Sequence, residues 1–247
     1  MEPGNLYIVA TPIGNLDDIT ARALATLRSV DLILCEDTRV TRNLLEHYQI
    51  KKPVESYHHH SDAKKIKDIT NLLESGKNLA LVTDAGTPGI SDPGNQLIAV
   101  IARSEERTTK QSPQFQNQFN NTDNKVTITP IPGPCAAIAA LSISGFPTDK
   151  FIFLGFPPHK NKRQKFFKEV AASEYTTVFY ESGHRILKCL GELAGLLSTD
   201  RQVVVCRELT KKFETIYRGS ITEVLEAMKD ERGEFVVVIA PDKMSKS

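Results

Sequence analysis

Short apolar runs rich in β-branched residues alternate with stretches of helical period along the first half of this 247-residue chain. The first segments, in the order strand, helix, strand, helix, are 6–10, 19–28, 31–35 and 38–48. A strand at 78–83 and a helix at 95–103 continue the series. Strands joined by helices run parallel and need cover on both faces, so the alternation predicts an α/β fold with a mostly parallel sheet. Ligands of such sheets bind at the carboxyl ends of the strands.

The second half again combines helices with strands, but its strands are connected differently. A helix of small residues is expected at 135–144, and apolar strands at 151–154, 177–180, 203–206 and 235–240. Segment 214–219 follows the third of these strands with no room for a crossover helix, which predicts a hairpin and a mixed sheet. We therefore expect two α/β domains, residues 1–124 and 125–247.

Residues 104–124 interrupt the alternation. They contain four Gln, four Asn and one Pro, and their large apolar residues are Phe115 and Phe119. This composition predicts a flexible surface insertion between a helix and the strand expected at 125–129. The cost of closing a loop grows slowly with its length, so the fold can accommodate it.

Net charge is +1 overall but uneven along the chain. Residues 1–124 carry 13 Lys and Arg against 16 Asp and Glu, whereas residues 125–247 carry 18 against 14. No apolar run approaches the roughly 18 residues of a membrane span, and the N-terminus does not resemble an export signal. The cysteines are too scattered for a zinc knuckle or disulfide framework, so we expect a cytoplasmic protein without a metal: Cys35, Cys135, Cys189 and Cys206.

The densest motif of the chain is the loop 83–94, which holds three glycines and two prolines directly after a predicted strand. Glycine lets backbone N–H groups approach a ligand, and proline stiffens the turn. Asp84 and Asp92 add negative charge, which favours a cationic ligand. Neither a dinucleotide nor a nucleoside-triphosphate loop pattern is present. An ordinary turn with Asp92 as a helix N-cap also fits this loop.

Two further Gly/Pro loops follow predicted strands, at 11–15 and 130–134. Pro134 stands where a helix would begin, which leaves that helix's first N–H groups available to a ligand. Each loop alone could be simple chain punctuation. Together, the three loops predict one cleft lined mostly by backbone.

Clusters of titratable residues lie at the predicted strand exits, at 36–39, 58–60, 181–185 and 207–212. Arginines of this kind grip phosphates through two parallel hydrogen bonds, although surface ion pairs explain them as well; the candidates are Arg39, Arg185 and Arg207. Three consecutive histidines, 58–60, cannot all face one metal from a strand, because neighbouring side chains point to opposite sides.

Segment 159–168 contains five Lys and Arg residues and no acid. Such a local field attracts a nucleic-acid backbone. A helix that buries Phe166 and Phe167 and solvates its cations explains the same pattern. Both interpretations stay open from the sequence.

The ordered series of motifs resembles the tetrapyrrole-methylase superfamily over nearly the whole chain. The series is LYIVATPIGNLDDIT from Leu6, CEDTR from Cys35, TDAGTPGISDPG from Thr83, PIPGP from Pro130, FYES and HR within 179–185, and RELTK from Arg207. Members that act on tetrapyrroles have a first loop like G-x-G-x-G-D, whereas this chain has Pro12-Ile13-Gly14-Asn15. That difference favours the branch that methylates small-subunit ribosomal RNA. Gly183 stands where this branch usually has proline.

The resemblance implies two α/β domains with S-adenosylmethionine in a cleft between them, and a homodimer. It implies transfer of a methyl group to a cytidine ribose 2'-hydroxyl in the decoding region of 16S ribosomal RNA within the small subunit. The methyl-donor contacts of the family fall on these positions: Pro12, Gly14, Asp84, Ala85, Gly86, Gly89, Asp92, Pro132, Gly133 and Pro134.

A ribose hydroxyl is a weak acid, so transfer benefits from a base at the 2'-oxygen. The candidates are Glu181, which we prefer at this stage, His184 and Glu208. Contacts to RNA are expected from Arg39, His58, Arg185 and Lys211. Two other hypotheses remain: a methyltransferase of the same fold acting on a tetrapyrrole or a protein side chain, and a non-catalytic RNA-binding assembly factor.

Overall fold

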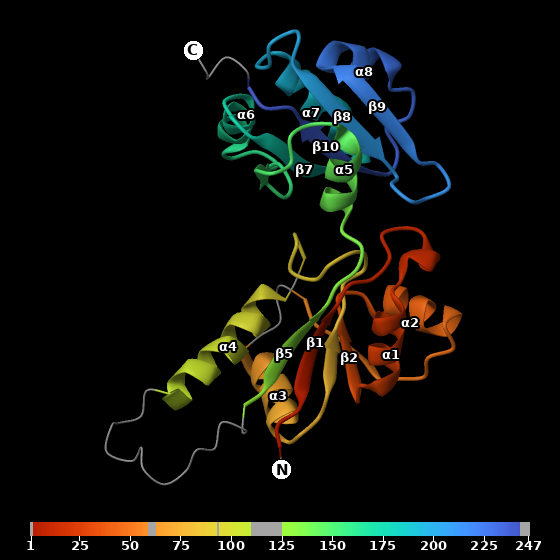
Figure 1. The fold of residues 1–247 in the computed structure, drawn as a ribbon, viewed down its shortest axis with the longest axis vertical. Helices are drawn as coiled ribbons and strands as arrows, with labels where there is room; N and C mark the ends of the chain where they lie inside the picture. The colour runs from red at the N-terminus through yellow and green to blue at the C-terminus, as the bar shows by residue number, and fades with distance from the viewer. Residues whose placement is uncertain (1, 59–62, 93, 110–124, 243–247) are drawn as a thin grey trace. The chain divides into compact units, whose positions relative to one another are not determined.

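The computed structural model describes residues 2–58, 63–92, 94–109 and 125–242. Its elements follow the order shown in Figure 1. The first part comprises β1 (Asn5–Val9), η1 (Leu16–Asp18), α1 (Ala21–Ser29), β2 (Leu32–Cys35), α2 (Thr38–His47), β3 (Val54–Ser56), α3 (Ala63–Glu74), β4 (Leu79–Leu81), α4 (Asn95–Thr109) and β5 (Thr127–Ile131). The second comprises α5 (Ala136–Ser144), β6 (Phe151–Phe153), α6 (Arg163–Ala171), β7 (Thr176–Ser182), α7 (Gly183–Ala194), β8 (Gln202–Arg207), β9 (Thr215–Ser220), α8 (Ile221–Ala227) and β10 (Glu234–Ile239).

The chain forms two compact units that exchange a short segment. One unit contains residues 1–12 and 16–134, and the other contains residues 13–15 and 135–247. β5 belongs to the first unit because it pairs with β1 along its whole length. The chain therefore passes between the units after Pro12, after Asn15 and after Pro134.

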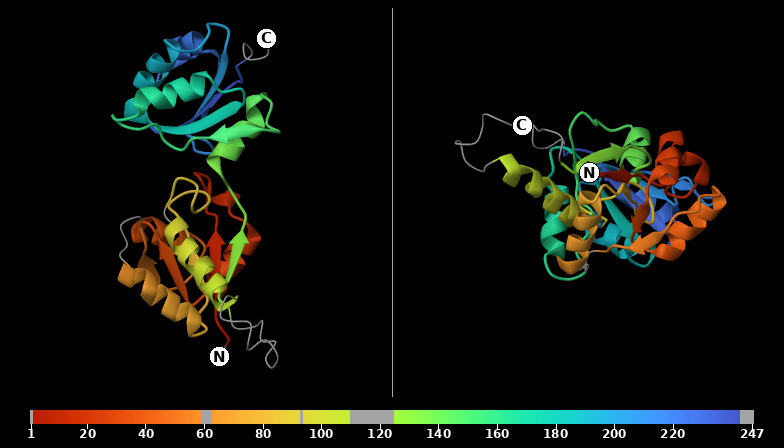
Figure 2. Two further views of the ribbon diagram at one scale, coloured as in Figure 1. Left: turned by 90° about the vertical axis from the view of Figure 1, so that its left-hand side faces the viewer. Right: turned by 90° about the horizontal axis from the view of Figure 1, so that it is seen from below.

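The first unit is built on a sheet in the order β3-β2-β4-β1-β5, in which all the pairs are parallel. Alternate side chains of each strand point to opposite faces. Leu79 and Leu81 pack with α3 and α4, and Ala80 packs with α1 and α2. Figures 1 and 2 show these helix pairs covering the two faces. The predicted parallel α/β fold is confirmed.

The second unit is built on a mixed sheet in the order β6-β7-β10-β8-β9. β6 and β7 are parallel, and the other pairs are antiparallel, including the predicted hairpin of β8 and β9. One face packs against α6, α7 and α8, and the other packs against α5. The predicted mixed sheet is confirmed. No helix in the described part of the chain is long and apolar enough to cross a membrane.

The predicted insertion begins inside a helix. α4 continues through Thr109, so residues 104–109 are helical rather than part of a loop, and residues 110–124 lie outside the described residues. Charged and polar residues such as Glu105, Glu106 and Arg107 are compatible with helix even where no apolar period is visible. The low apolar content of this segment therefore concealed the end of α4.

Gly183, at the start of α7, explains one departure from the resembling sequences. Its N–H donates a hydrogen bond to the carbonyl of Gly233 at 2.9 Å, which a proline could not do. A Cβ atom at this position would lie 2.2 Å from the carbonyl oxygen of Glu231. Glycine is therefore the residue that this close backbone approach allows.

α8 begins with a capping box, in which Ser220 and Glu223 satisfy each other's backbone N–H groups. We expect Ser220→Ala to lower the free energy of unfolding by about 1 kcal/mol, because it leaves a helix N–H without its acceptor. Chemical denaturation measures the loss. Thr222→Ala, an exposed position in the same turn, is the control and should change stability by less than about 0.5 kcal/mol. Equal stability of the two variants would contradict the cap.

Candidate functional site

The three predicted Gly/Pro loops meet at one edge of the first sheet. They follow β4, β1 and β5, which are neighbours in the strand order. Thr11 and Gly86 form an antiparallel bridge, with N–H to oxygen distances of 2.9 and 3.1 Å. The Thr87 hydroxyl donates to the carbonyl of Pro134 at 2.9 Å. The loops are thus joined by backbone hydrogen bonds and by one hydroxyl hydrogen bond, which the individual motifs do not reveal.

Glycine is required at specific points of these loops. Gly86 and Gly89 have φ angles of 84° and 85°, a left-handed conformation that other residues rarely adopt. A Cβ atom on Gly133 would lie 3.0 Å from the Cβ atom of Ala10. The surface left to solvent is short side chains and backbone: Asp84, Ala85, Pro132 and Gly133 are exposed, whereas Pro12 and Gly86 are buried.

Carboxylates gather at the same edge. The backbone N–H of Asp37, after β2, donates to Asp84 at 3.0 Å, and the Thr83 hydroxyl donates to Glu36 at 3.4 Å. Burial and the negative charge of Glu36 raise the pKa of Asp92 to about 7. Burial also raises the pKa of Asp84. The loop therefore holds closely spaced carboxyl groups that resist ionisation together.

Glu36 was missed as a member of this group by the sequence analysis, which placed it with a separate cluster at 36–39. The signal was available: β2 and β4 are both apolar runs, and the carboxyl ends of parallel strands meet at one edge. What the sequence did not reveal is that β2 and β4 are paired in the sheet.

Gly14 lies in the short segment 13–15, which belongs to the second unit. The N–H of Asn15 donates to the Thr210 hydroxyl at 3.1 Å. A Cβ atom on Gly14 would lie 2.3 Å from Cγ of Lys211. Two predicted site residues from distant parts of the chain, Gly14 and Lys211, are therefore packed together.

The predicted residues of the second unit share one edge of the mixed sheet. β7 and β8 both run antiparallel to β10, so their carboxyl ends point the same way. Glu181 lies near the end of β7, His184 is the second residue of α7, and Glu208 follows β8. His184 is exposed, whereas Glu181 is buried.

Glu181 is enclosed by positive charge. Its side chain has no exposed surface, and Oε1 lies 2.7 Å from Nη2 of Arg185. The same oxygen accepts the backbone N–H of Ser182 at 2.9 Å, and Oε2 lies 3.8 Å from Nη1 of Arg163. Arg163 also binds Glu192 at 2.7 Å. The structure thus makes Glu181 the centre of a buried ion cluster.

Glu208 and Lys211 form a second cluster at this edge. Nζ of Lys211 lies 3.0 Å from Glu208 and 2.8 Å from Glu234. Glu208 also accepts the backbone N–H of Glu234 at 2.9 Å. Glu234, which the sequence analysis did not single out, stands at the start of β10 between β7 and β8. Lys211 is therefore held by two carboxylates, one directly after β8 and one at the start of β10.

The predicted arginine contacts have different surroundings. The Arg39 side chain is 85% exposed and is paired with Asp37, the N-cap of α2. Arg207 is buried and donates to the carbonyls of Arg232 and Phe213 and to the carboxylate of Asp230. Its guanidinium therefore has a structural role within the second unit. His58 is exposed. His59 and His60 lie outside the described residues.

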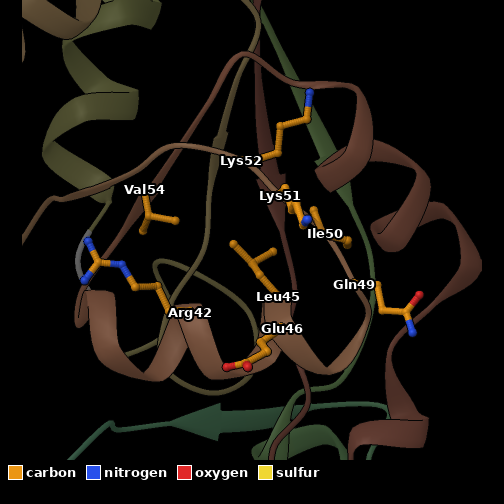
Figure 3. Close-up of a pocket in the computed structure, with 8 residues that line it drawn as sticks. All are labelled: Arg42, Leu45, Glu46, Gln49, Ile50, Lys51, Lys52 and Val54. Carbon is orange, nitrogen blue, oxygen red and sulfur yellow. The ribbon is translucent and has the colours of Figure 1, made fainter.

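A separate open groove lies between α2 and β3 (Figure 3). Leu45, Ile50 and Val54 form its apolar part, and the cations Arg42, Lys51 and Lys52 stand around them. None of the predicted site residues lines it. The groove is therefore distinct from the loops after β1, β4 and β5.

Comparison with known families identifies a family that matches most of this chain. The family model "Tetrapyrrole (Corrin/Porphyrin) Methylases" matches residues 5–110 and 113–225. The chain therefore belongs to the tetrapyrrole methylase family. Solved structures of similar fold include a cobalt precorrin-4 methyltransferase, with a TM-score of 0.66, 19% identity, and coverage of 96% of this chain and 94% of that one.

Curated relatives narrow the comparison within the family. Proteins named "Ribosomal RNA small subunit methyltransferase I" are similar over almost the whole chain. The relative from Synechocystis is 43% identical, covering 96% of this chain and 79% of its own length. The relative from Escherichia coli O157:H7 is 42% identical with 97% and 79% coverage, and that from Thermotoga maritima is 41% identical with 96% and 98% coverage.

Proposed function

We propose that this chain transfers a methyl group from S-adenosylmethionine to the ribose 2'-oxygen of a cytidine in the decoding region of 16S ribosomal RNA. The observation that carries the proposal is the 41–43% identity to curated small-subunit ribosomal RNA methyltransferases along at least 96% of the chain. The first loop, which lacks the G-x-G-x-G-D pattern, supports an RNA rather than a tetrapyrrole acceptor.

The edge formed by the loops after β1, β4 and β5 suits a sulfonium donor. Burial, followed by the negative charge of Glu36, raises the pKa of Asp92, and a bound cation would stabilise the ionised carboxyl against both effects. Exposed backbone at Ala85, Pro132 and Gly133 can contact polar parts of a ligand at close range. The positions proposed to hold the donor are therefore Pro12, Gly14, Asp84, Ala85, Gly86, Gly89, Asp92, Pro132, Gly133 and Pro134.

When bound, S-adenosylmethionine supplies a methyl group on a positively charged sulfur. The chain's task is to hold the 2'-oxygen in line with that methyl group and to accept the hydroxyl proton. His184 is exposed, whereas Glu181 and Glu208 are engaged in ion pairs. We therefore assign the base to His184 and positioning roles to Glu181 and Glu208, a different choice from the one favoured by the sequence.

The RNA contacts remain those expected from the sequence. Arg39 is exposed and can reach a phosphate, and Arg185 and Lys211 are held in place by carboxylates. His58 is exposed and can stack on a base or donate to it. A homodimer and a cytoplasmic location complete the proposal.

The decisive experiment uses small ribosomal subunits that lack the modification, together with S-adenosylmethionine labelled in the methyl group. We expect label in the 16S RNA, recovered as 2'-O-methylcytidine after digestion. Label in a porphyrin precursor instead, or in a ribosomal protein, would support another methyltransferase of this fold. No transfer to any acceptor by a protein that S-adenosylmethionine stabilises against heat would support a non-catalytic assembly factor.

A further inference from the structure

The segment 156–165 and the first turns of α6 and α7 form a basic surface on the second unit. Its lysines all have exposed side chains: Lys160, Lys162, Lys165 and, one turn further along α6, Lys168. None of the salt bridges within residues 2–58, 63–92, 94–109 and 125–242 involves these four residues. Their charges are therefore available to an anionic partner.

The sequence allowed two interpretations of segment 159–168: a cluster of cations that binds nucleic acid, or a helix that buries Phe166 and Phe167. In the structure the two are compatible. Phe166 and Phe167 are buried, and Arg163 shares their face because residues 163, 166, 167 and 170 recur at helical spacing. Lys165 and Lys168 lie in the same helix and are exposed, and Lys160 and Lys162 directly precede it. Burial of one face thus orients the remaining cations outward, so core packing and a charged surface are compatible.

Arg163 fixes the loop that carries these lysines. Its Nη1 donates to the carbonyl of Pro158 at 3.1 Å, while its Nε binds Glu192 of α7. Nη1 of Arg185 lies 2.8 Å from Nε2 of His159. The segment is therefore tied to α6 and α7 at two successive residues. A surface held in one conformation loses less entropy on binding than a mobile loop does.

An exposed aromatic ring precedes these cations in the sequence, four residues before Lys160. Phe156 is 50% exposed, and its ring lies 5.5 Å from that of Tyr180, which gives it a fixed position. The N–H of Tyr180 donates to the carbonyl of Gly155 at 2.8 Å and holds the preceding residue beside β7. An exposed ring and exposed lysines in one segment are the residue types that bind single-stranded RNA, the ring through base stacking and the lysines through phosphate contacts.

We infer that this surface binds the backbone of the RNA substrate near the target nucleotide, with Lys160, Lys162 and Lys165 contacting phosphates and Phe156 stacking on an unpaired base. The inference rests on the proposed function and adds contacts to it. Arg185 connects this surface with the proposed catalytic residues, because it contacts both His159 of the surface and Glu181. An acidic protein surface would not use the exposed ring of Phe156 in this way.

The test compares Lys160→Gln/Lys162→Gln/Lys165→Gln with Lys64→Gln/Lys67→Gln/Lys229→Gln. The control changes three exposed lysines that form no salt bridge with another described residue. Binding to deproteinised 16S RNA and to small subunits is measured at several salt concentrations. We expect the first variant to bind RNA about tenfold or more weakly at 0.1 M salt. The slope of the logarithm of the binding constant against the logarithm of the salt concentration should become shallower by about 2, because each phosphate contact contributes roughly 0.7–0.9 to that slope. Affinity for S-adenosylmethionine should be unchanged.

Phe156→Ala tests the stacking contact separately. We expect about tenfold weaker RNA binding with an unchanged salt slope, and recovery in Phe156→Trp, because stacking depends on a ring and not on charge. The thermal midpoint of each variant shows whether folding is preserved.

Two results would overturn the inference. One is RNA binding by the triple variant that equals that of its control. The other is weakened binding to small subunits with unchanged binding to deproteinised RNA, which would assign the surface to a ribosomal protein. Either result leaves the proposed function intact if the wild-type protein methylates small subunits. Failure of the proposed function is recognised by the absence of that methylation.

Discussion

Glu181→Ala should lower the free energy of unfolding by about 3–5 kcal/mol, because it leaves Arg185 without its buried counter-charge and Arg163 with Glu192 alone. The side chain of Glu181 has no exposed surface, and those of Arg163 and Arg185 are 7% and 15% exposed. Water therefore cannot replace the lost carboxylate. Denaturant unfolding followed by circular dichroism measures the change.

Glu181→Gln separates the structural role from the catalytic one. The amide keeps the volume and can still accept a hydrogen bond from Arg185, so we expect a smaller loss of stability. If Glu181 positions Arg185, the variant should raise KM for small subunits more than it lowers kcat, and the pH profile should stay unchanged. If Glu181 is the base, as the sequence favoured, kcat should fall while affinity for the methyl donor survives.

The matched control is Glu169→Gln, an exposed carboxylate on α6 that forms no ion pair among the described residues. Its stability and kinetics should equal those of the wild-type protein. Should Glu181→Ala also unfold within about 1 kcal/mol of wild type, the buried ion cluster would not be a stabilising feature.

Asp92→Asn should weaken binding of S-adenosylmethionine about tenfold at pH 8 and much less at pH 6. The pKa of Asp92 is raised to about 7 by burial and by the charge of Glu36, so the carboxyl is mostly protonated at pH 6 and ionised at pH 8. Its ionised form attracts the sulfonium cation, and a tenfold change corresponds to about 1.4 kcal/mol. Affinity of the wild-type protein should therefore rise with pH through about 7.

Stability should respond to pH in the opposite direction. A carboxyl with a raised pKa binds a proton more tightly in the folded state, so its contribution is present below pH 4 and is lost as pH rises to about 7. An asparagine at this position cannot ionise, so Asp92→Asn should not lose stability as the pH rises. At pH 8 its free energy of unfolding should exceed that of the wild-type protein by about 1–2 kcal/mol after allowance for solvent screening.

Isothermal calorimetry at the two pH values measures the affinity, and denaturation at pH 5 and 8 measures the stability. Asp68→Asn, an exposed carboxylate on α3, is the control and should leave both pH profiles unchanged. A wild-type affinity that does not change between pH 6 and 8 would remove Asp92 from the donor site.

Much of the fold was predictable because hydrophobic period is a local property. Leu79, Ala80 and Leu81 form a short apolar run typical of a strand buried on both faces, and residues 66, 69 and 73 mark the inner side of α3. The connection between β8 and β9 is too short for anything but a hairpin, so the mixed sheet also followed from the sequence. The Gly/Pro loops were visible as motifs for the same reason.

Only the tertiary structure decided which of these local features meet. The strand order β3-β2-β4-β1-β5 places the loops of β4, β1 and β5 side by side and brings Glu36 to Asp92, and no local pattern encodes that order. Which charged residues are buried was also not predictable from the sequence. Arg163 and Lys165 belong to one basic segment, yet Arg163 is buried in an ion cluster and Lys165 is exposed. Burial depends on what packs against a side chain, and its partners here, Glu181 and Glu192, lie 18 and 29 residues away along the chain.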